Sequence, residues 1–266
     1  MPADHYARSG PRWALGAELV YRPIAAELVA TCPHRLTGRT VLDAGAGTGA
    51  ATPALRRRGA RILAIDLSPA MLTWQAEARP PCAVADIRSL PLPANAVDDS
   101  LAAFVLNHLA DPATGLAELA RVTRPGGAIL AAVFANDSRS EARDLIDAAA
   151  AAAGWAPPAW YREMKTTTVP ILSTAAAMAT AARAADLTHV HADERAIDVG
   201  ITEPCQLVRY RLGHPAFAAW LDAIGPERAT AFAAKAEHAV GDAMEPYQPL
   251  VVFLRAVTRP GRPRQP

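Results

Sequence analysis

Three aspartates stand at the ends of three successive predicted strands, and the first precedes a glycine-rich turn. Asp43 lies just before a turn that contains Gly45 and Gly47, Asp66 ends the second strand, and Asp86 ends the third. A pyrophosphate would repel the carboxylate of Asp43, which instead suits a ligand that carries an ammonium or a sulfonium. Asp66 is placed to accept hydrogen bonds from ribose hydroxyls, and Asp86 from the exocyclic amine of adenine. The three acids predict a site for a nucleoside with a positive charge.

The glycine turn by itself is also compatible with a second ligand, NAD. Gly45, Gly47 and Ala50 also satisfy the dinucleotide pattern G-x-G-x-x-G/A, which an NAD-dependent oxidoreductase would carry. Glycines here let the backbone turn tightly and approach a ligand at the start of the next helix. Asp43 and Asp86 disfavour NAD, so the oxidoreductase is the weaker interpretation.

Short apolar runs alternate with helical patterns through the first half of the chain. This rhythm predicts an α/β fold, a parallel sheet with helices on both faces, after an N-terminal helix interrupted at Pro23. The expected helices are residues 12–30, 49–58, 69–78 and 111–123. The expected strands are residues 40–44, 61–66, 82–85, 98–106 and 128–134.

After residue 134 the alternation is broken by two helical insertions, 138–172 and 203–243. A helix over 173–186, an extended stretch over 189–201 and a strand over 250–257 complete the fold. We expect the insertions to meet as a cap over one edge. The predicted organisation is a lead-in 1–39, a core 40–137, a first cap insertion 138–172, a continued core 173–201, a second cap insertion 202–247, and a last strand and tail 248–266.

Five segments resemble one family in order and spacing. They are VLDAGAGTG, AIDLSPAML, VADIRSLPLPANAVD, DDSLAAFVLNHLADP and RPGGAILAAVF, between residues 41 and 134. Together they resemble the class I methyltransferases that use S-adenosylmethionine (SAM), especially the ubiquinone/menaquinone-type and natural-product enzymes. The resemblance implies a Rossmann-like, mostly parallel seven-stranded sheet with helices on both faces, and methyl transfer from SAM to a small organic metabolite, plausibly in secondary metabolism. Val97 replaces the family's usual aromatic residue, a departure that we expect to affect packing only.

The same resemblance implies the cofactor contacts. Asp43 and the glycines of the turn would surround the methionine part of SAM, Asp66 the ribose, and Asp86 with Ile87 the adenine. The cofactor-binding residues expected in this way are Asp43, Gly45, Gly47, Gly49, Asp66, Leu67, Met71, Asp86, Ile87 and Ala103.

Methyl transfer from a sulfonium depends mainly on alignment and exclusion of water, so a base is needed only where the acceptor holds a proton. The candidates for a base or an orienting group are Tyr6, Tyr21, Asn107, His108 and His214, the last of which we expect in a loop of the second insertion. For His108, packing against the next helix is the favoured interpretation. The cap aromatics predict an apolar acceptor pocket with a few polar groups, or else they fasten the insertions to the core. The expected acceptor residues are Tyr6, Trp160, Tyr161, Met164, Arg209 and Tyr210.

The amino-acid composition limits the classes of binding partner that we expect. The 266 residues carry a net charge of +1 and no basic stripe, which disfavours nucleic acid and anionic membranes. Three scattered cysteines and no signal-peptide pattern predict a cytoplasmic protein without a metal. No pattern indicates an oligomeric state. The expected partner is a small-molecule methyl acceptor, and a SAM binder or SAM-assisted cyclase without methyl transfer remains the alternative function.

Overall fold

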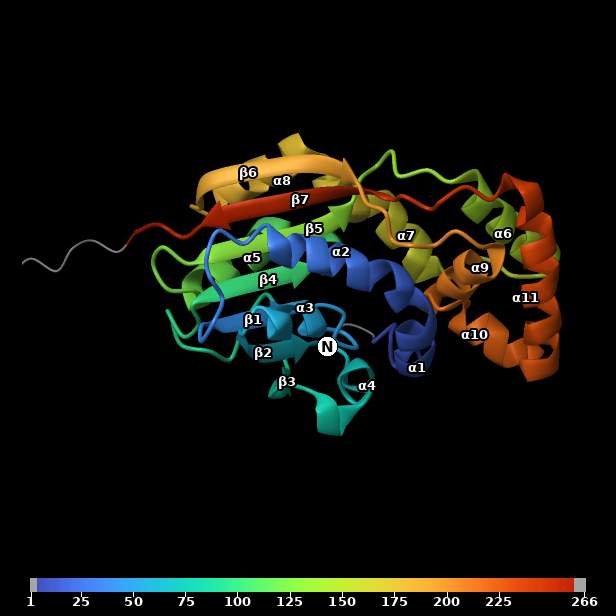
Figure 1. The fold of residues 1–266 in the computed structure, drawn as a ribbon, viewed down its shortest axis with the longest axis horizontal. Helices are drawn as coiled ribbons and strands as arrows, with labels where there is room; N and C mark the ends of the chain where they lie inside the picture. Colours follow the sequence, from blue (N-terminus) through green and yellow to red (C-terminus); the bar gives the residue numbers. More distant parts are fainter. Residues whose placement is uncertain (1–3, 261–266) are drawn as a thin grey trace, which may run out of the picture.

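A single seven-stranded sheet organises the chain in the computed structural model, which describes residues 4–260 (Figure 1). The strand order is β3-β2-β1-β4-β5-β7-β6; the first five of these are parallel, while β7 runs antiparallel to both β5 and β6. This is the Rossmann-like, mostly parallel sheet predicted from the sequence. The strands are β1 Thr40–Ala44, β2 Arg61–Asp66, β3 Cys82–Val84, β4 Asp99–Ala103, β5 Ala128–Phe134, β6 Thr188–Ala196 and β7 Leu250–Val257.

Helices cover both faces of the sheet. Neighbouring residues of a strand point to opposite sides, so each strand contributes to the core on both faces. Val41 and Leu130 belong to one buried cluster, whereas Leu42 and Ile129 belong to the other. The first cluster is completed by α2 (Glu18–Ala30) and α3 (Thr52–Arg57), and the second by α5 (Pro112–Val122) and α8 (Ala175–Ala184). Continuous apolar strands such as β5 are therefore buried from both sides.

The two insertions lie against each other at one end of the molecule, beyond the strand ends (Figure 1). The first holds α6 (Glu141–Ala152) and α7 (Ala159–Thr167); the second holds α9 (Pro204–Leu212), α10 (Pro215–Ile224) and α11 (Pro226–Val240). α6 packs on both α9 and α11. Trp155 stacks on Phe217 with ring centroids 4.1 Å apart, and Arg211 pairs with Asp147.

Several elements differ from their predicted bounds. The lead-in is α1 (Gly10–Arg12), a π-helical segment over Trp13–Ala17, and then α2, which continues through Pro23. A proline removes only one backbone donor, and the buried face of α2 maintains the helix around it. The helix expected over 69–78 shortens to α4 (Pro69–Leu72) and a 3-10 turn, because Gln75 adopts a left-handed φ of 49°. Phe104, with φ 60°, likewise ends β4 before residue 106.

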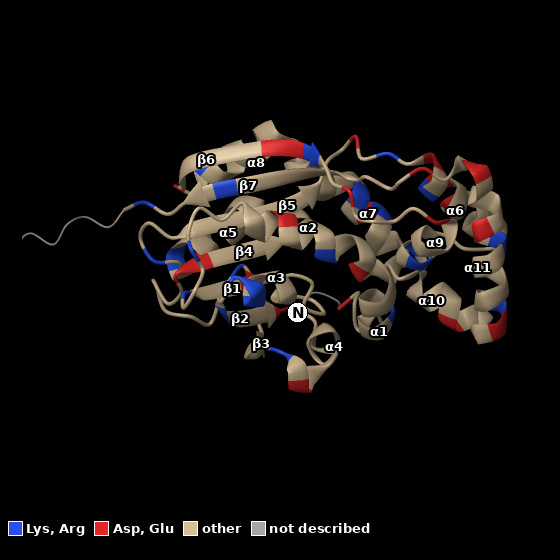
Figure 2. Ribbon diagram, viewed as in Figure 1, with Lys and Arg blue, Asp and Glu red and all other residues tan. Residues whose placement is uncertain are grey.

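Acidic and basic residues are interspersed along the described helices and strands, as Figure 2 shows. Among residues 4–260, no helix combines the length and the apolar character needed to cross a membrane.

Candidate functional site

A cavity of about 1050 Å³ opens beyond the carboxyl ends of the central strands. Parallel α/β sheets bind ligands at this edge. Most of the residues predicted for the site line it: Tyr6, Tyr21, Asp43, Gly45, Gly47, Asp66, Leu67, Met71, Asp86, Ile87, Ala103, Asn107, His108, Trp160, Tyr161, Met164 and Tyr210.

Gly49 and Arg209 are predicted site residues that do not line this cavity. Gly49 has φ 101° and turns the chain toward α3. Arg209 is exposed, and its Nε donates to the carbonyl of Leu15 at 2.6 Å. The structure does not bring Arg209 to the acceptor pocket, because α9 directs Tyr210 into the cavity and the neighbouring Arg209 side chain toward the lead-in segment.

Asp43 ends in the cavity with one oxygen free. The residue is 2% exposed, and Oδ2 has no hydrogen-bond partner among the described residues. Burial raises the pKa of Asp43 to about 7. Gly45 and Gly47 have φ of 72° and 53°, and a Cβ on Gly45 would come within 2.5 Å of the Cβ of Val105. A buried carboxylate without a partner beside a tightly turned backbone fits the ammonium and sulfonium of SAM.

Asp66 holds the glycine turn from the neighbouring strand. Its Oδ2 accepts from the backbone N–H of Gly47 and its Oδ1 from that of Ser68, both at 2.8 Å. Burial raises the pKa of Asp66, and the two backbone hydrogen bonds oppose that rise. Since each carboxylate oxygen can accept more than one hydrogen bond, Asp66 retains capacity for ribose hydroxyls. Arg79, which sequence reasoning missed, supports the same turn by donating to the carbonyl of Gly47 at 2.8 Å.

Asp86 reaches the cavity from the loop after β3, but it already has a partner. Its two oxygens accept from Nε and a terminal nitrogen of Arg88 at 2.6 to 3.1 Å, and this pair lowers the pKa of Asp86. An adenine amine would therefore share the carboxylate with Arg88. Ile87 and Met71, 5% and 3% exposed, provide apolar surface nearby.

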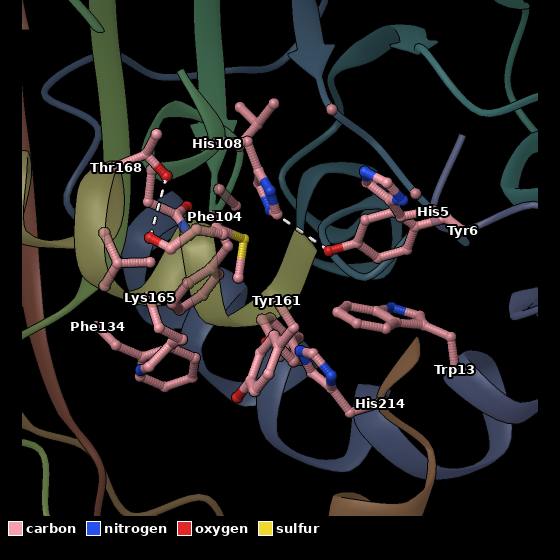
Figure 3. A pocket seen from close by; sticks show the side chains of 18 of the residues that line it. His5, Tyr6, Trp13, Phe104, His108, Phe134, Tyr161, Lys165, Thr168 and His214 are labelled. Atoms are coloured by element: carbon pink, nitrogen blue, oxygen red, sulfur yellow. Dashed lines mark hydrogen bonds between the residues drawn. The ribbon is translucent and has the colours of Figure 1, made fainter. Parts of the chain in front are cut away.

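The other half of the cavity is walled by aromatic rings. Measured between ring centroids, Tyr21 lies 4.6 Å from Trp13 and 4.8 Å from Phe104. Phe104 lies 4.6 Å from Phe134, and Figure 3 shows these two rings and Trp13 around the cavity. Trp13, Phe104 and Phe134 line the cavity and were not predicted for the site. Only Trp13 carried a signal, since it belongs to the helical apolar pattern of the lead-in. The wall would exclude water from an acceptor.

Two histidines point into this aromatic half (Figure 3). Nε2 of His108 lies 3.3 Å from the hydroxyl of Tyr6, and burial lowers the pKa of His108 to about 4. His214, which the sequence placed in a loop, caps α10 by accepting from the N–H of Ala216, and burial lowers its pKa too. Both rings are neutral at pH 7. Oδ1 of Asn107 is buried without a partner among the described residues.

The N-terminal segment covers the cavity and contacts the first insertion. The ring of His5 stacks on that of Trp160, with centroids 4.5 Å apart and planes inclined by 8°. Asp4 accepts from the hydroxyl of Ser68 at 2.8 Å, which fixes the same segment beside the cofactor half.

A second cluster, Cys32, His34 and Asp99, brings metal-ligand types together outside the cavity. Asp99 accepts from Nε of Arg39 at 2.6 Å and from the N–H of Ala128 at 2.8 Å, and it contacts His34 at 2.6 Å. The guanidinium of Arg39 already neutralises the carboxylate of Asp99. We therefore interpret the cluster as a structural link between the loop before β1 and strand β4.

The sheet is Rossmann-like with an antiparallel β7, and it carries a glycine turn after Asp43 of β1 and a second acid, Asp66, at the end of β2. Residues 42–131 match the family model described as a methyltransferase domain. Over these residues the chain is similar to methyltransferases, as the sequence segments between residues 41 and 134 led us to expect.

Two curated relatives and one solved structure illustrate the similarity. Malonyl-[acyl-carrier protein] O-methyltransferase of Serratia marcescens is 42% identical over 109 residues, which cover 40% of this chain and 43% of that protein. Demethylmenaquinone methyltransferase of Mycolicibacterium paratuberculosis is 37% identical over 103 residues, covering 39% and 45%. The chain thus spans less than half the length of these relatives. A chain from the Haloferax volcanii complex of the Trm112 methyltransferase activator with a methyltransferase has a TM-score of 0.58 at 22% identity, covering 96% of both chains, and shows the shared fold.

Proposed function

We propose that the protein transfers the methyl group of SAM to a small organic metabolite, in secondary metabolism and in the cytoplasm. The observation that carries the proposal is Asp43, a buried carboxylate with a free oxygen beside the glycine turn. Such a group costs stability unless a cation binds it. SAM carries two positive charges at its methionine end, whereas a pyrophosphate of NAD would be repelled.

The cavity has room for an acceptor beside the cofactor. Its volume of about 1050 Å³ lies at the upper end of the range for single small-molecule sites. Asp43, Asp66 and Asp86 would hold the methionine, ribose and adenine parts in one half. When bound, SAM supplies a sulfonium methyl group for in-line displacement. Tyr21 and the other aromatic residues would align the acceptor with that methyl group and exclude water.

His108 is our candidate for the group that receives a proton from the acceptor. Its ring lines the cavity, and its Nε2 lies within hydrogen-bond distance of the Tyr6 hydroxyl. A neutral imidazole can accept a proton where an imidazolium cannot. Tyr6 would orient the ring, and the free Oδ1 of Asn107 would position the acceptor.

The relatives share the methyltransferase class and differ in the acceptor that their names state. One is named for malonyl-[acyl-carrier protein] and the other for demethylmenaquinone. The acceptor of this chain therefore has to be found directly.

The test combines cofactor binding with detection of a labelled product. Calorimetry should show binding of SAM but not of NADH. Incubation with trideuteromethyl-SAM and a metabolite extract should produce a labelled small molecule together with S-adenosylhomocysteine, and Asp43→Asn should reduce both. SAM binding without S-adenosylhomocysteine formation on any substrate would overturn methyl transfer and favour a SAM binder or a SAM-assisted cyclase.

A further inference from the structure

We propose that Arg143 binds an acidic group of the acceptor, so that the substrates are apolar molecules bearing a carboxylate. The inference rests on the proposed function, because it assigns a substrate class to the acceptor half of the same cavity.

Arg143 lines the cavity from the first turn of α6 and lacks a close carboxylate. Its side chain is 26% exposed, and one terminal nitrogen donates to the carbonyl of Ser138 at 3.3 Å. Among the described residues the nearest carboxylate is that of Asp144, at 3.8 Å, whose side chain is 70% exposed and well solvated. A guanidinium has five N–H donors, so most of those of Arg143 have no protein acceptor among the described residues.

The other cations of the cavity are either paired or exposed. Arg211 makes a bidentate pair with Asp147 at 2.6 and 2.7 Å, and Arg88 pairs with Asp86. Arg139 and Lys165 are exposed to solvent. Among the described cations of the cavity lining, Arg143 is thus the one that is largely buried and has no carboxylate within hydrogen-bond distance.

The position of Arg143 in the first turn of α6 also favours binding of an anion. The N-terminal turn of a helix carries partial positive charge, so a cation there is disfavoured and an anion is favoured. A ligand carboxylate near Arg143 would interact favourably with both the guanidinium and the start of α6. The acids Asp43 and Asp66 lie in the cofactor half. The acceptor half also holds Asp144 and Asp147, but Asp144 is solvated and Asp147 is paired with Arg211, so Arg143 is the cation there that a ligand carboxylate could approach.

The remaining lining of this half defines the body of the ligand. Tyr21, Phe104, Phe134 and Tyr210 present ring faces and edges, and Tyr210 precedes the charge-paired Arg211 on α9. Aromatic walls of this kind favour flat or apolar molecules. An apolar carboxylic acid matches both the rings and the guanidinium.

Matched acids and amides test the proposal, since an amide keeps the shape and loses the charge. The probes are 4-hydroxybenzoic acid, 1-hydroxy-2-naphthoic acid and decanoic acid, each with its carboxamide, titrated by calorimetry into protein saturated with S-adenosylhomocysteine. We expect at least one acid to bind roughly tenfold tighter than its amide. Arg143→Gln should abolish the preference and Arg143→Lys should retain part of it. Arg162→Gln, an equal charge change at an exposed position of α7 outside the cavity lining, should leave it intact.

Equal binding of acid and amide in every pair, or a preference that survives Arg143→Gln with an unchanged melting temperature, would overturn the proposal. Failure of the proposed function looks different. In that case the incubation with trideuteromethyl-SAM would give no labelled product, while the same titrations, on the unliganded protein if S-adenosylhomocysteine does not bind, would still report the charge preference of Arg143.

Discussion

Replacing Asp43 by Asn removes a charge and leaves the shape of the side chain nearly unchanged. We expect this substitution to weaken the binding of SAM. A hydrogen bond to a charged group contributes about 1.5 to 3 kcal/mol, so the dissociation constant of SAM should rise roughly tenfold to a hundredfold. Adenosine has neither the ammonium nor the sulfonium, and its affinity should change much less. The difference between the two ligands measures the electrostatic role of Asp43.

The same substitution should stabilise the unliganded protein. Burial raises the pKa of Asp43 from 3.8 to about 7, which means that its ionised form costs folding up to about 4 kcal/mol above that pH. The folded state binds this proton more tightly than the unfolded state does, so the contribution of Asp43 to stability falls as pH rises from about 4 to about 7. Asp43→Asn should therefore raise the melting temperature at pH 8 and have a smaller effect at pH 5.

Calorimetric titration at pH 8 and pH 6 checks both effects. SAM affinity of the wild type should fall by up to about tenfold at pH 6, because the proton on Asp43 competes with the cation, and the Asn variant should lose this dependence. Asp242→Asn, at an exposed position, is the matched control. If adenosine and SAM lose affinity equally and the variant melts at a lower temperature at pH 8, Asp43 only shapes the loop and the reasoning is refuted.

Three further substitutions separate the two halves of the cavity. Asp66→Ala should raise the SAM dissociation constant about tenfold or more by calorimetry; an unchanged constant would remove Asp66 from the site. His108→Ala should lower kcat by about a hundredfold with SAM affinity and melting temperature near the wild type; a lower melting temperature with unchanged kcat would show that the ring only packs. Trp160→Ala should raise the acceptor's KM and leave SAM affinity unaltered, and the reverse pattern would assign Trp160 to the cofactor half.

The sequence predicted which acids and glycines lie together at one end of the cavity, because local rules determine their positions. A buried strand, a glycine turn and an acid at the strand end are adjacent in the chain, so their spacing alone brings Asp43 and Gly45 together. Asp66 and Asp86 follow because parallel strands end at the same edge of the sheet. What the sequence did not reveal is the partner of each acid: Arg88 on Asp86 and the backbone of Gly47 on Asp66.

The acceptor half depends on tertiary packing, which spacing does not encode. Arg209 and Tyr210 are adjacent on α9, and only the rotation of that helix decides which of them faces the cavity. Phe104 enters the wall because its left-handed backbone ends β4, a conformation unusual for a bulky residue. Arg143 gave no signal in the sequence, since an arginine on a helix is ordinarily a solvated residue.

The similarity to the relatives covers the cofactor half of the cavity more than the acceptor half. The matched stretch, residues 42–131, contains Asp43, Asp66 and Asp86, and so covers the acids that would bind SAM. The residues that would meet the acceptor lie mostly outside it, among them Tyr6 before it and Arg143 after it. A cofactor site can be inherited unchanged while the segments around it take new acceptors. We therefore expect the lead-in and the two insertions, together with Phe104, Asn107 and His108 of the core, to determine the acceptor, and the acid-and-amide titrations test the contribution of Arg143 directly.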